Sequence, residues 1–322
     1  MDGYDIIGDV HGCAEELKRL LERMGYVLGS DGFYSHPSRV AVFVGDLIDR
    51  GPGQVEVVNI VQKMVRAGTA KIAMGNHEFN AISYATADPK QAGRFMRNRE
   101  TKTASHQEFL SQFVLDSPLY NETIEWFKTL PLWLELEDGP RIIHACWYEP
   151  AMKDLNDVLV SGEPLSDEFI VRANTRETKE FEAVEILLKG PELKLTDYDL
   201  PMFLDKGGTP RSGARIRWWR EGSDALNQLA EINGDATTEE GEPYPALPSI
   251  PLSREDLRYQ YRSEEPLVVF GHYWKDGELA IEENTNTICV DYSAVMGGEL
   301  VAYRWNRDGG SHLIGHQEHS EE

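Results

Sequence analysis

Three apolar runs in the first ninety residues end in the same way, and this repetition restricts the chain to few folds. The runs in "YDIIGDVHG" (residues 4–12), "VAVFVGDLIDRGPG" (residues 40–53) and "KIAMGNHE" (residues 71–78) each leave through a glycine into an aspartate or an asparagine. Apolar residues then recur at helical spacing, as Leu17 and Leu20 do after the first run. Continuous apolar strands that alternate with helices are typical of a largely parallel sheet covered on both faces. We therefore expect an α/β fold.

Further strands are indicated beyond this region. The segment "LWLELEDGPRIIHACW" (residues 132–147) predicts two strands joined by a turn, and "PLVVFGHYW" (residues 266–274) predicts another apolar strand that ends in glycine and histidine. The segments "TICVDYS" and "ELVAYRW" predict an antiparallel pair near the end of the chain. We expect the tail after Arg307 to be loose.

Between these strands the composition changes, which bears on domain organisation. Residues 148–265 are charged and interrupted by prolines, with one helix expected over Thr178–Leu188. We expect a single domain over residues 1–322 that carries residues 148–265 as an insertion or cap, because residues that flank the insertion must meet in one site. The basic segment 90–102 is expected to be a solvated helix face.

The net charge of −23 limits the possible partners. It gives no general attraction to nucleic acid or to an anionic membrane, so we expect stable binding to neither. Any phosphate-binding site needs local positive charge. The three cysteines are too few and too scattered for a disulfide framework, and no apolar run approaches the roughly 18 residues of a membrane span. We expect a cytoplasmic location.

Six residues that follow apolar runs are of types that bind divalent metals. They are Asp9, His11, Asp46, Asn76, His144 and His272. Any one of them alone is more often structural, because an aspartate caps helices, an asparagine makes turns and a buried histidine forms hydrogen bonds. All six share their placement at strand ends, which favours a metal site. Six oxygen and imidazole donors suit two ions, and Mn, Fe, Zn and Ni all accept such ligands.

The motifs together resemble the calcineurin-like metallophosphoesterases, in the branch that contains phosphoprotein phosphatases and bacterial diadenosine tetraphosphatases. The matching blocks, in order, are "GDVHG", "GDLIDRG", "GNHE", "IIHA" and "FGH". They cover roughly the first 150 and the last 60 residues. The resemblance implies two packed mixed β-sheets flanked by helices, an α-β-β-α sandwich. The sequence departs from that of many relatives after His144, where "ACWYEP" replaces a glycine-rich stretch. The larger side chains imply a bulkier pocket wall.

The resemblance also implies roles for the metal-binding residues. Asp9 and His11 would hold the first ion, Asp46 would bridge both ions, and the second ion would be held by Asn76, His144 and His272. The two divalent ions are expected to be manganese, with iron, zinc or nickel as alternatives. A metal-bound hydroxide would then attack a phosphoester or a phosphoanhydride.

Three further residues would act on the substrate. His77 would protonate the leaving oxygen as general acid, and Asp49 would keep its imidazole protonated. Arg50 would clamp the phosphoryl oxygens. In the insertion, Arg215 and Arg217 lie in a basic segment with two tryptophans and are candidates for contacts with remote parts of the substrate. The alternative there is an ordinary basic loop with buried tryptophans.

Three functions remain open at this point. "GDVHGC" and "DRGPG" favour hydrolysis of dinucleoside polyphosphates or other small phosphorylated molecules. The complete "GDLIDRG" and "GNHE" suit a serine/threonine phosphoprotein phosphatase equally well. A non-catalytic metal-binding scaffold is the third possibility, although none of the expected ligands is missing. The partner is accordingly a small phosphorylated substrate or a phosphoprotein.

Overall fold

A computed structural model describes residues 1–99, 104–160, 162–205, 208–281 and 286–317. The chain divides into two compact units, which are described separately. The first contains residues 1–189 and 266–322, and the second contains residues 190–265. The expected insertion began at residue 148, whereas residues 148–189 belong to the first unit. Within the described residues, no helix is both long and apolar enough to cross a membrane.

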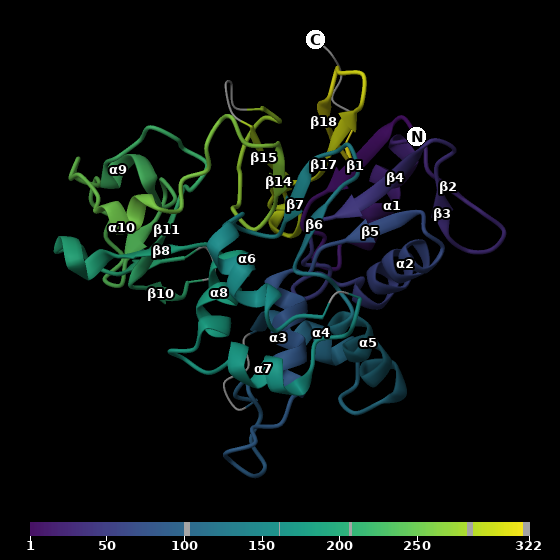
Figure 1. Cartoon of the computed structure of the whole chain (residues 1–322), viewed down its shortest axis with the longest axis horizontal. Helices are drawn as coiled ribbons and strands as arrows, with labels where there is room; N and C mark the ends of the chain where they lie inside the picture. The colour runs from purple at the N-terminus through teal and green to yellow at the C-terminus, as the bar shows by residue number, and fades with distance from the viewer. Residues whose placement is uncertain (100–103, 161, 206–207, 282–285, 318–322) are drawn as a thin grey trace. The chain divides into compact units, whose positions relative to one another are not determined.

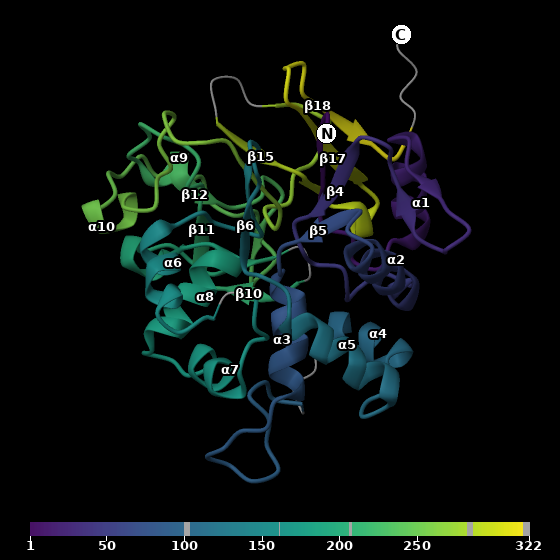
Figure 2. The same cartoon turned by 45° about the vertical axis from the view of Figure 1, so that its right-hand side comes forward.

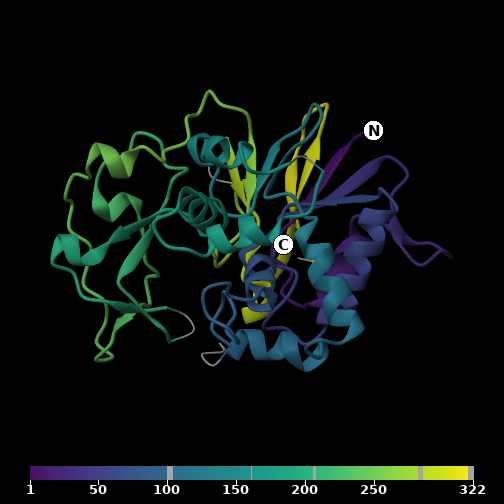
Figure 3. The same cartoon turned by 60° about the horizontal axis from the view of Figure 1, so that its bottom comes forward.

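The larger sheet of the first unit has the strand order β16-β17-β1-β4-β5, with β18 paired to β17. Strand β1 runs parallel to β4, β4 runs parallel to β5, and β17 runs antiparallel to β1. The strands are β1 (Gly3–Ile7), β4 (Arg39–Phe43), β5 (Ala70–Ile72), β16 (Asp291–Tyr292), β17 (Glu299–Asn306) and β18 (His312–Gly315). The first and last long strands of the chain therefore lie side by side (Figures 1 and 3).

The smaller sheet has the order β15-β14-β7-β6. Its strands are β6 (Trp133–Glu135), β7 (Arg141–Ile143), β14 (Val268–Phe270) and β15 (Thr287–Cys289). The predicted hairpin is confirmed, because β6 and β7 pair antiparallel. The predicted pairing of "TICVDYS" with "ELVAYRW" holds only for its second half: Asp291 faces Leu300, while Thr287–Cys289 joins the smaller sheet.

The apolar faces of the two sheets form one core. Ile6 and Val42 of the larger sheet belong to the same buried cluster as Ile142, Val269 and Ile288 of the smaller sheet. Full burial of a side chain of this size contributes about 1.5–3 kcal/mol. The two-sheet α/β arrangement that the motifs implied is thus observed.

Helices surround the sheets of the first unit. They are α1 (Ala14–Arg23), α2 (Gln54–Arg66), α3 (Asn76–Ala85), α4 (Ala104–Gln112), α5 (Pro118–Lys128), α6 (Glu149–Asn156), α7 (Asp167–Ala173) and α8 (Lys179–Lys189), with a short hairpin of β2 (Val27–Leu28) and β3 (Tyr34–Ser35). Helix α1 packs beside α2 and over β17, while α2 packs against β5 (Figures 1 and 2). The buried face of α1 carries Leu17, Leu20 and Leu21, which fits the helical spacing of these residues.

The second unit is built from two small sheets. Their strand orders are β12-β11-β8 and β10-β9-β13. The elements are β8 (Glu192–Lys194), β9 (Phe203–Leu204), β10 (Pro210–Arg211), β11 (Gly213–Ile216), α9 (Leu226–Leu229), β12 (Ala230–Glu231), β13 (Thr237–Thr238) and α10 (Arg254–Leu257). Trp218 is fully buried, and its ring meets those of Trp219 and Tyr261 edge to face. The two tryptophans are therefore core residues of this unit.

Two local expectations are wrong. Residues 312–315 form β18 on the edge of β17, because backbone pairing and the packing of Leu313 on the core order this part of the tail. Residues 318–322 lie outside the described residues. The described part of segment 90–102 is not a helix: after α3 the chain bends, and the guanidinium of Arg99 packs 3.1 Å from the centre of the Phe95 ring. Residues 100–102 lie outside the described residues. The helix expected over 178–188 is confirmed as α8.

A buried ion-pair network joins β1 to both neighbouring strands. Asp5, which is fully buried, accepts hydrogen bonds from Arg39 Nε at 3.1 Å and from Arg304 Nε at 2.8 Å. The two guanidinium groups also donate to the carbonyl oxygens of Trp305 and Met24. One carboxylate therefore compensates two cations at the centre of the sheet.

We predict that Asp5→Asn lowers the free energy of unfolding of the first unit by about 3–5 kcal/mol, because removing one partner of a buried ion pair leaves uncompensated charge. Urea denaturation in the presence of a chelator measures this without a contribution from metal binding. The control is Asp308→Asn at an exposed position, which should change stability by less than about 0.5 kcal/mol. Equal stability of the two variants would show that the network does not stabilise the sheet.

Candidate metal centre

The polar residues that follow five strands meet where the two sheets adjoin. Strands β1, β4 and β5 supply Asp9, His11, Asp46 and Asn76, and strands β7 and β14 supply His144 and His272. Open α/β sheets place ligands at such carboxyl ends. The Oδ2 atom of Asp46 lies 3.6 Å from His11 Nε2 and 3.3 Å from His144 Nε2. His144 Nε2 also lies 3.0 Å from the Asn76 side-chain oxygen.

Asp46 belongs to two groups of potential ligands. One group is His11, Asp46 and His77, and the other is Asp46, His144 and His272; within each group the donor atoms lie within 4.8 Å of one another. A carboxylate shared by two donor groups has the placement that a bridging ligand requires. Asp9 stands beside the second group, where its Oδ2 accepts the backbone N–H of His272 at 3.2 Å. The structure thus brings the six predicted residues together.

The imidazoles are oriented as metal ligands commonly are. Nδ1 of His11 donates to the Ile48 carbonyl at 2.7 Å, and Nδ1 of His144 donates to the Val44 carbonyl at 3.0 Å. These hydrogen bonds turn Nε2 of each ring toward Asp46. Burial and the nearby Arg50 and His77 lower the pKa of His11 to about 3, so its ring is neutral. A neutral imidazole is the form that coordinates a metal.

Several buried carboxyl groups lie around Asp46. Burial and the neighbouring Asp291 and Asp46 raise the pKa of Asp9 well above its usual value, and burial raises that of Asp291 to about 6. Burial alone would also raise the pKa of Asp46, but the imidazoles of His144 and His77 hold it well below its usual value. Cations bound between these groups would compensate the charge. The donor set therefore fits divalent metal ions.

The backbone is strained or closely packed in the loops that carry the predicted ligands. His11, Asp46 and His272 have positive φ angles of 44°, 52° and 64°, which non-glycine residues rarely adopt. Such strain is concentrated at functional sites. A Cβ atom on Gly75 would lie 2.2 Å from Asp46 Oδ1, and one on Gly271 would lie 2.0 Å from Asp9 Oδ1. Glycine is therefore required where these loops touch the carboxylates.

His77 and Asp49 form a pair next to the ligands. Nδ1 of His77 lies 2.5 Å from Asp49 Oδ2, and Nε2 of His77 lies 3.8 Å from Asp46 Oδ2. Burial opposes ionisation of Asp49, yet His77 and His106 hold its pKa at about 2. Arg50 Nη1 lies 3.1 Å from His11 Nε2, and its guanidinium stacks over the ring of Trp274. The three residues with predicted catalytic roles thus border the metal ligands.

Sequence reasoning assigned no role to several residues of this site. Asp291 lies on the short strand β16, and only its position after an apolar run could have indicated it. The carboxylate of Glu78 accepts hydrogen bonds from the backbone N–H groups of Asp46, Leu47 and Gly75. His106 comes from α4, and no sequence pattern places it beside Asp49.

Several other charged or reactive residues have a clear placement. Arg97 is half-buried, and its charge interacts with Asp49 and Glu185. In the second unit, Arg215 lies on β11 opposite Glu231, and Arg217 forms an ion pair with the same glutamate. The three cysteines Cys13, Cys146 and Cys289 are buried and free.

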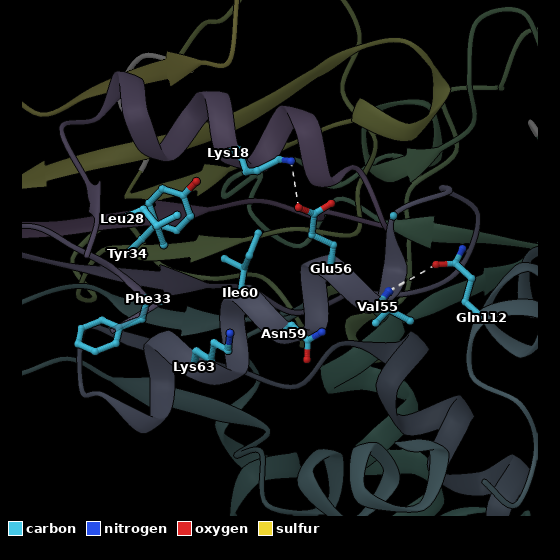
Figure 4. Close-up of a pocket in the computed structure, with 12 residues that line it drawn as sticks. Lys18, Leu28, Phe33, Tyr34, Val55, Glu56, Asn59, Ile60, Lys63 and Gln112 are labelled. Carbon is cyan, nitrogen blue, oxygen red and sulfur yellow. Dashed lines mark hydrogen bonds and ion pairs between the residues drawn. The ribbon is translucent and has the colours of Figure 1, made fainter. Parts of the chain in front are cut away.

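A separate cavity of about 490 Å³ lies between α1, α2 and the β2–β3 hairpin. Figure 4 shows Lys18 paired with Glu56 on one side and Gln112 bonded to the backbone of Val55 on the other. Phe33, Ile60 and Lys63 also line it. No predicted ligand or catalytic residue is among the lining residues, so this cavity is distinct from the metal centre.

Comparisons with known proteins agree with this geometry. The family model for calcineurin-like phosphoesterases matches residues 4–273. The asymmetrical bis(5'-nucleosyl)-tetraphosphatase PrpE of Halalkalibacterium halodurans is 51% identical over 75 residues, which are 23% of this chain and 30% of the relative. The protein of the same name from Bacillus subtilis is 33% identical over 140 residues, which are 44% of this chain and 55% of the relative. The matches therefore span about half or less of each relative.

The whole fold is also shared with a solved structure. A protein serine/threonine phosphatase from Saccharomyces cerevisiae, with similarity to human phosphatase PP5, has a TM-score of 0.52 and 13% identity. The likeness covers 99% of this chain and 81% of that one. At this identity the likeness concerns the fold alone.

We predict that the purified protein binds about two divalent ions per chain, because one carboxylate belongs to both donor groups. Asp46→Asn should lose both ions, whereas His272→Asn should lose mainly one. Metal analysis after loading with manganese and removal of excess ions measures this. Asp308→Asn is the control and should keep the wild-type content. Wild-type metal content in Asp46→Asn would rule out a bridging role.

Proposed function

The chain belongs to the calcineurin-like phosphoesterase family, and on that premise we propose that it is a hydrolase with two metal ions that cleaves phosphoanhydrides of dinucleoside polyphosphates or related small molecules. The observation that carries this proposal is the convergence of five further donor residues on the buried Asp46, with the Asp49–His77 pair beside them. Manganese is the proposed metal. A reducing, cytoplasmic location is proposed as well, supported by three buried free cysteines.

The proposed chemistry divides the work between the ions and the side chains. Divalent ions held by these residues would activate water as a nucleophile and would neutralise charge on phosphoryl oxygens. We propose that the guanidinium of Arg50, which stacks over the ring of Trp274, holds phosphoryl oxygens through paired N–H donors. His77 directs Nε2 toward the centre and donates from Nδ1 to Asp49. We propose that Nε2 delivers a proton to the leaving oxygen.

The substrate class rests on similarity and on composition. The PrpE proteins are named bis(5'-nucleosyl)-tetraphosphatases, and their matches to this chain reach 51% identity. A dinucleoside polyphosphate is highly anionic, so its binding to a chain with a net charge of −23 depends on local cations such as Arg50 and the bound ions. A serine/threonine phosphoprotein phosphatase is the second candidate, favoured by the complete "GDLIDRG" and "GNHE" motifs.

One substrate panel tests this proposal. Protein stripped with a chelator and reloaded with manganese is assayed on diadenosine tetraphosphate, a chromogenic monoester, a bis-ester and a phosphopeptide. We predict that kcat/KM is highest for diadenosine tetraphosphate, by about tenfold or more over the phosphopeptide. The stripped protein and Asp46→Asn should both be inactive. Preference for the phosphopeptide would support the second candidate, and inactivity of the loaded protein on all substrates would support a scaffold.

The arginines of the second unit are proposed to contact parts of the substrate away from the reacting phosphorus. The support is their position in a segment from Lys206 to Arg220 that has five basic residues and no acid. Arg217 is paired with Glu231, which holds its guanidinium in place. Contacts of this kind contribute affinity and orientation for a large substrate.

We predict that Arg215→Ala combined with Arg217→Ala lowers kcat/KM for diadenosine tetraphosphate by about tenfold, consistent with the loss of one or two charge-assisted hydrogen bonds. Turnover of the small chromogenic ester should stay nearly unchanged. Arg254→Ala, at an exposed position of the same unit, is the control. If the ratio of large-substrate to small-substrate activity does not change, the basic segment has a structural role only, and the melting temperature then measures that role.

A further inference from the structure

We propose that His106 is a positioning residue that holds the carboxylate of Asp49 in the orientation from which it fixes His77. This inference rests on the proposed function, since it concerns the delivery of a proton by His77. It starts from an arrangement of three buried side chains. Asp49 lies between two imidazoles, with His77 Nδ1 at 2.5 Å from Oδ2 and His106 Nδ1 at 3.1 Å from Oδ1.

The carboxylate of Asp49 contacts both imidazoles. Each binds a different oxygen, and no other side chain among the described residues donates to Asp49. A carboxylate held at one oxygen only can rotate about its Cβ–Cγ bond, whereas one held at both oxygens is fixed in its plane. The contact of His106 with Oδ1 therefore determines where Oδ2 meets the ring of His77.

The surroundings of His106 indicate which of its ring nitrogens carries the proton. Its Nε2 atom is buried and has no hydrogen-bond partner among the residues that the structure describes. The ring centre lies 4.6 Å from that of Tyr84 and 5.5 Å from that of Phe109. A charged imidazolium would leave a buried N–H without an acceptor, which is costly. Because Asp49 can only accept while it is ionised, the proton of the neutral His106 ring is on Nδ1. His106 thus donates from Nδ1 to Asp49 Oδ1.

Helix α4 is anchored so that this donor stays in place. Phe109 and Phe113 are fully buried and stack on each other at 4.6 Å. At the end of the helix, the side-chain oxygen of Gln112 accepts the backbone N–H of Gln54 at 3.1 Å. The side-chain oxygen of Gln54 in turn accepts the backbone N–H of Asp49 at 3.0 Å. Helix α4 therefore holds the side chain of Asp49 directly and its backbone through Gln54.

Two substitutions of His106 separate the effect of its N–H donor from the effect of its ring shape. His106→Phe keeps an aromatic ring among Tyr84 and Phe109 but removes the N–H. His106→Asn places an amide N–H near the position of Nδ1. Both variants, loaded with manganese, are assayed on a nitrophenyl ester, whose leaving group needs little protonation, and on an alkyl ester, whose leaving group needs a proton. Melting temperatures are recorded for each variant.

We expect His106→Phe to lower kcat on the alkyl ester by about ten- to a hundredfold, the loss that follows from removing one hydrogen bond to a charged group. The nitrophenyl ester should lose less than about threefold, and KM should change little on both. His106→Asn should recover most of the alkyl-ester activity. In an Asp49→Asn background, His106→Phe should have no further effect, because the interaction it removes is already broken.

Two results would overturn the inference. Equal losses on both esters, in step with the melting temperature, would give His106 a structural role only. Additive losses from His106→Phe and Asp49→Asn would show that His106 does not act through Asp49. His77→Asn in the same assay separates this failure from a failure of the proposed function. If His77→Asn affects both esters equally, His77 is not the general acid; if it affects mainly the alkyl ester while His106→Phe does not, only the role of His106 is lost.

Discussion

The buried carboxylate of Asp46 is the group around which the rest of the site is arranged. It follows β4 in a left-handed conformation, is about 1% exposed and faces imidazoles from both sheets. Burial of an isolated carboxylate would be prohibitive, so it persists only because positive or hydrogen-bonding groups surround it. The backbone N–H of His77 donates to its Oδ1 atom at 2.9 Å. The loops of the centre therefore depend on the groups that compensate the charge of Asp46.

The carboxylate of Glu78 supports the loop that carries Asp46. Glu78 binds the backbone N–H groups of Asp46 and Leu47 at 2.8 Å and that of Gly75 at 3.0 Å. Burial and the charge of Asp46 raise the pKa of Glu78 to about 7. Two adjacent loops are therefore held together by hydrogen bonds from their backbone N–H groups to one side chain. The glutamate of "GNHE" has a structural explanation that is independent of the kind of substrate.

The sequence predicted those parts of the site that depend on local pattern. A strand that ends in glycine and then Asp, Asn or His can be identified from the residues alone, which is why Asp9, Asp46 and Asn76 were selected. Asp291 and His106 were not selected, because Asp291 follows an apolar run without the glycine and lies on a strand of only two residues, whereas His106 reaches the site through the packing of a helix without distinguishing residues. Strand β18 was missed for the same reason, since its order comes from pairing with β17. The roles of the catalytic residues remain predictions.

The pairing of β1 with β17 has a consequence for biosynthesis. Gly3 lies opposite Asn306, and His272 reaches across 263 positions of sequence to contact Asp9. A growing chain on the ribosome therefore presents Asp9, His11 and Asp46 long before it can supply His144, His272 or the strand that closes the sheet. Contacts so distant in sequence form late and slowly. The emerging segment lacks His144 and His272, so the donor group around Asp46 stays incomplete until residue 272 has been made.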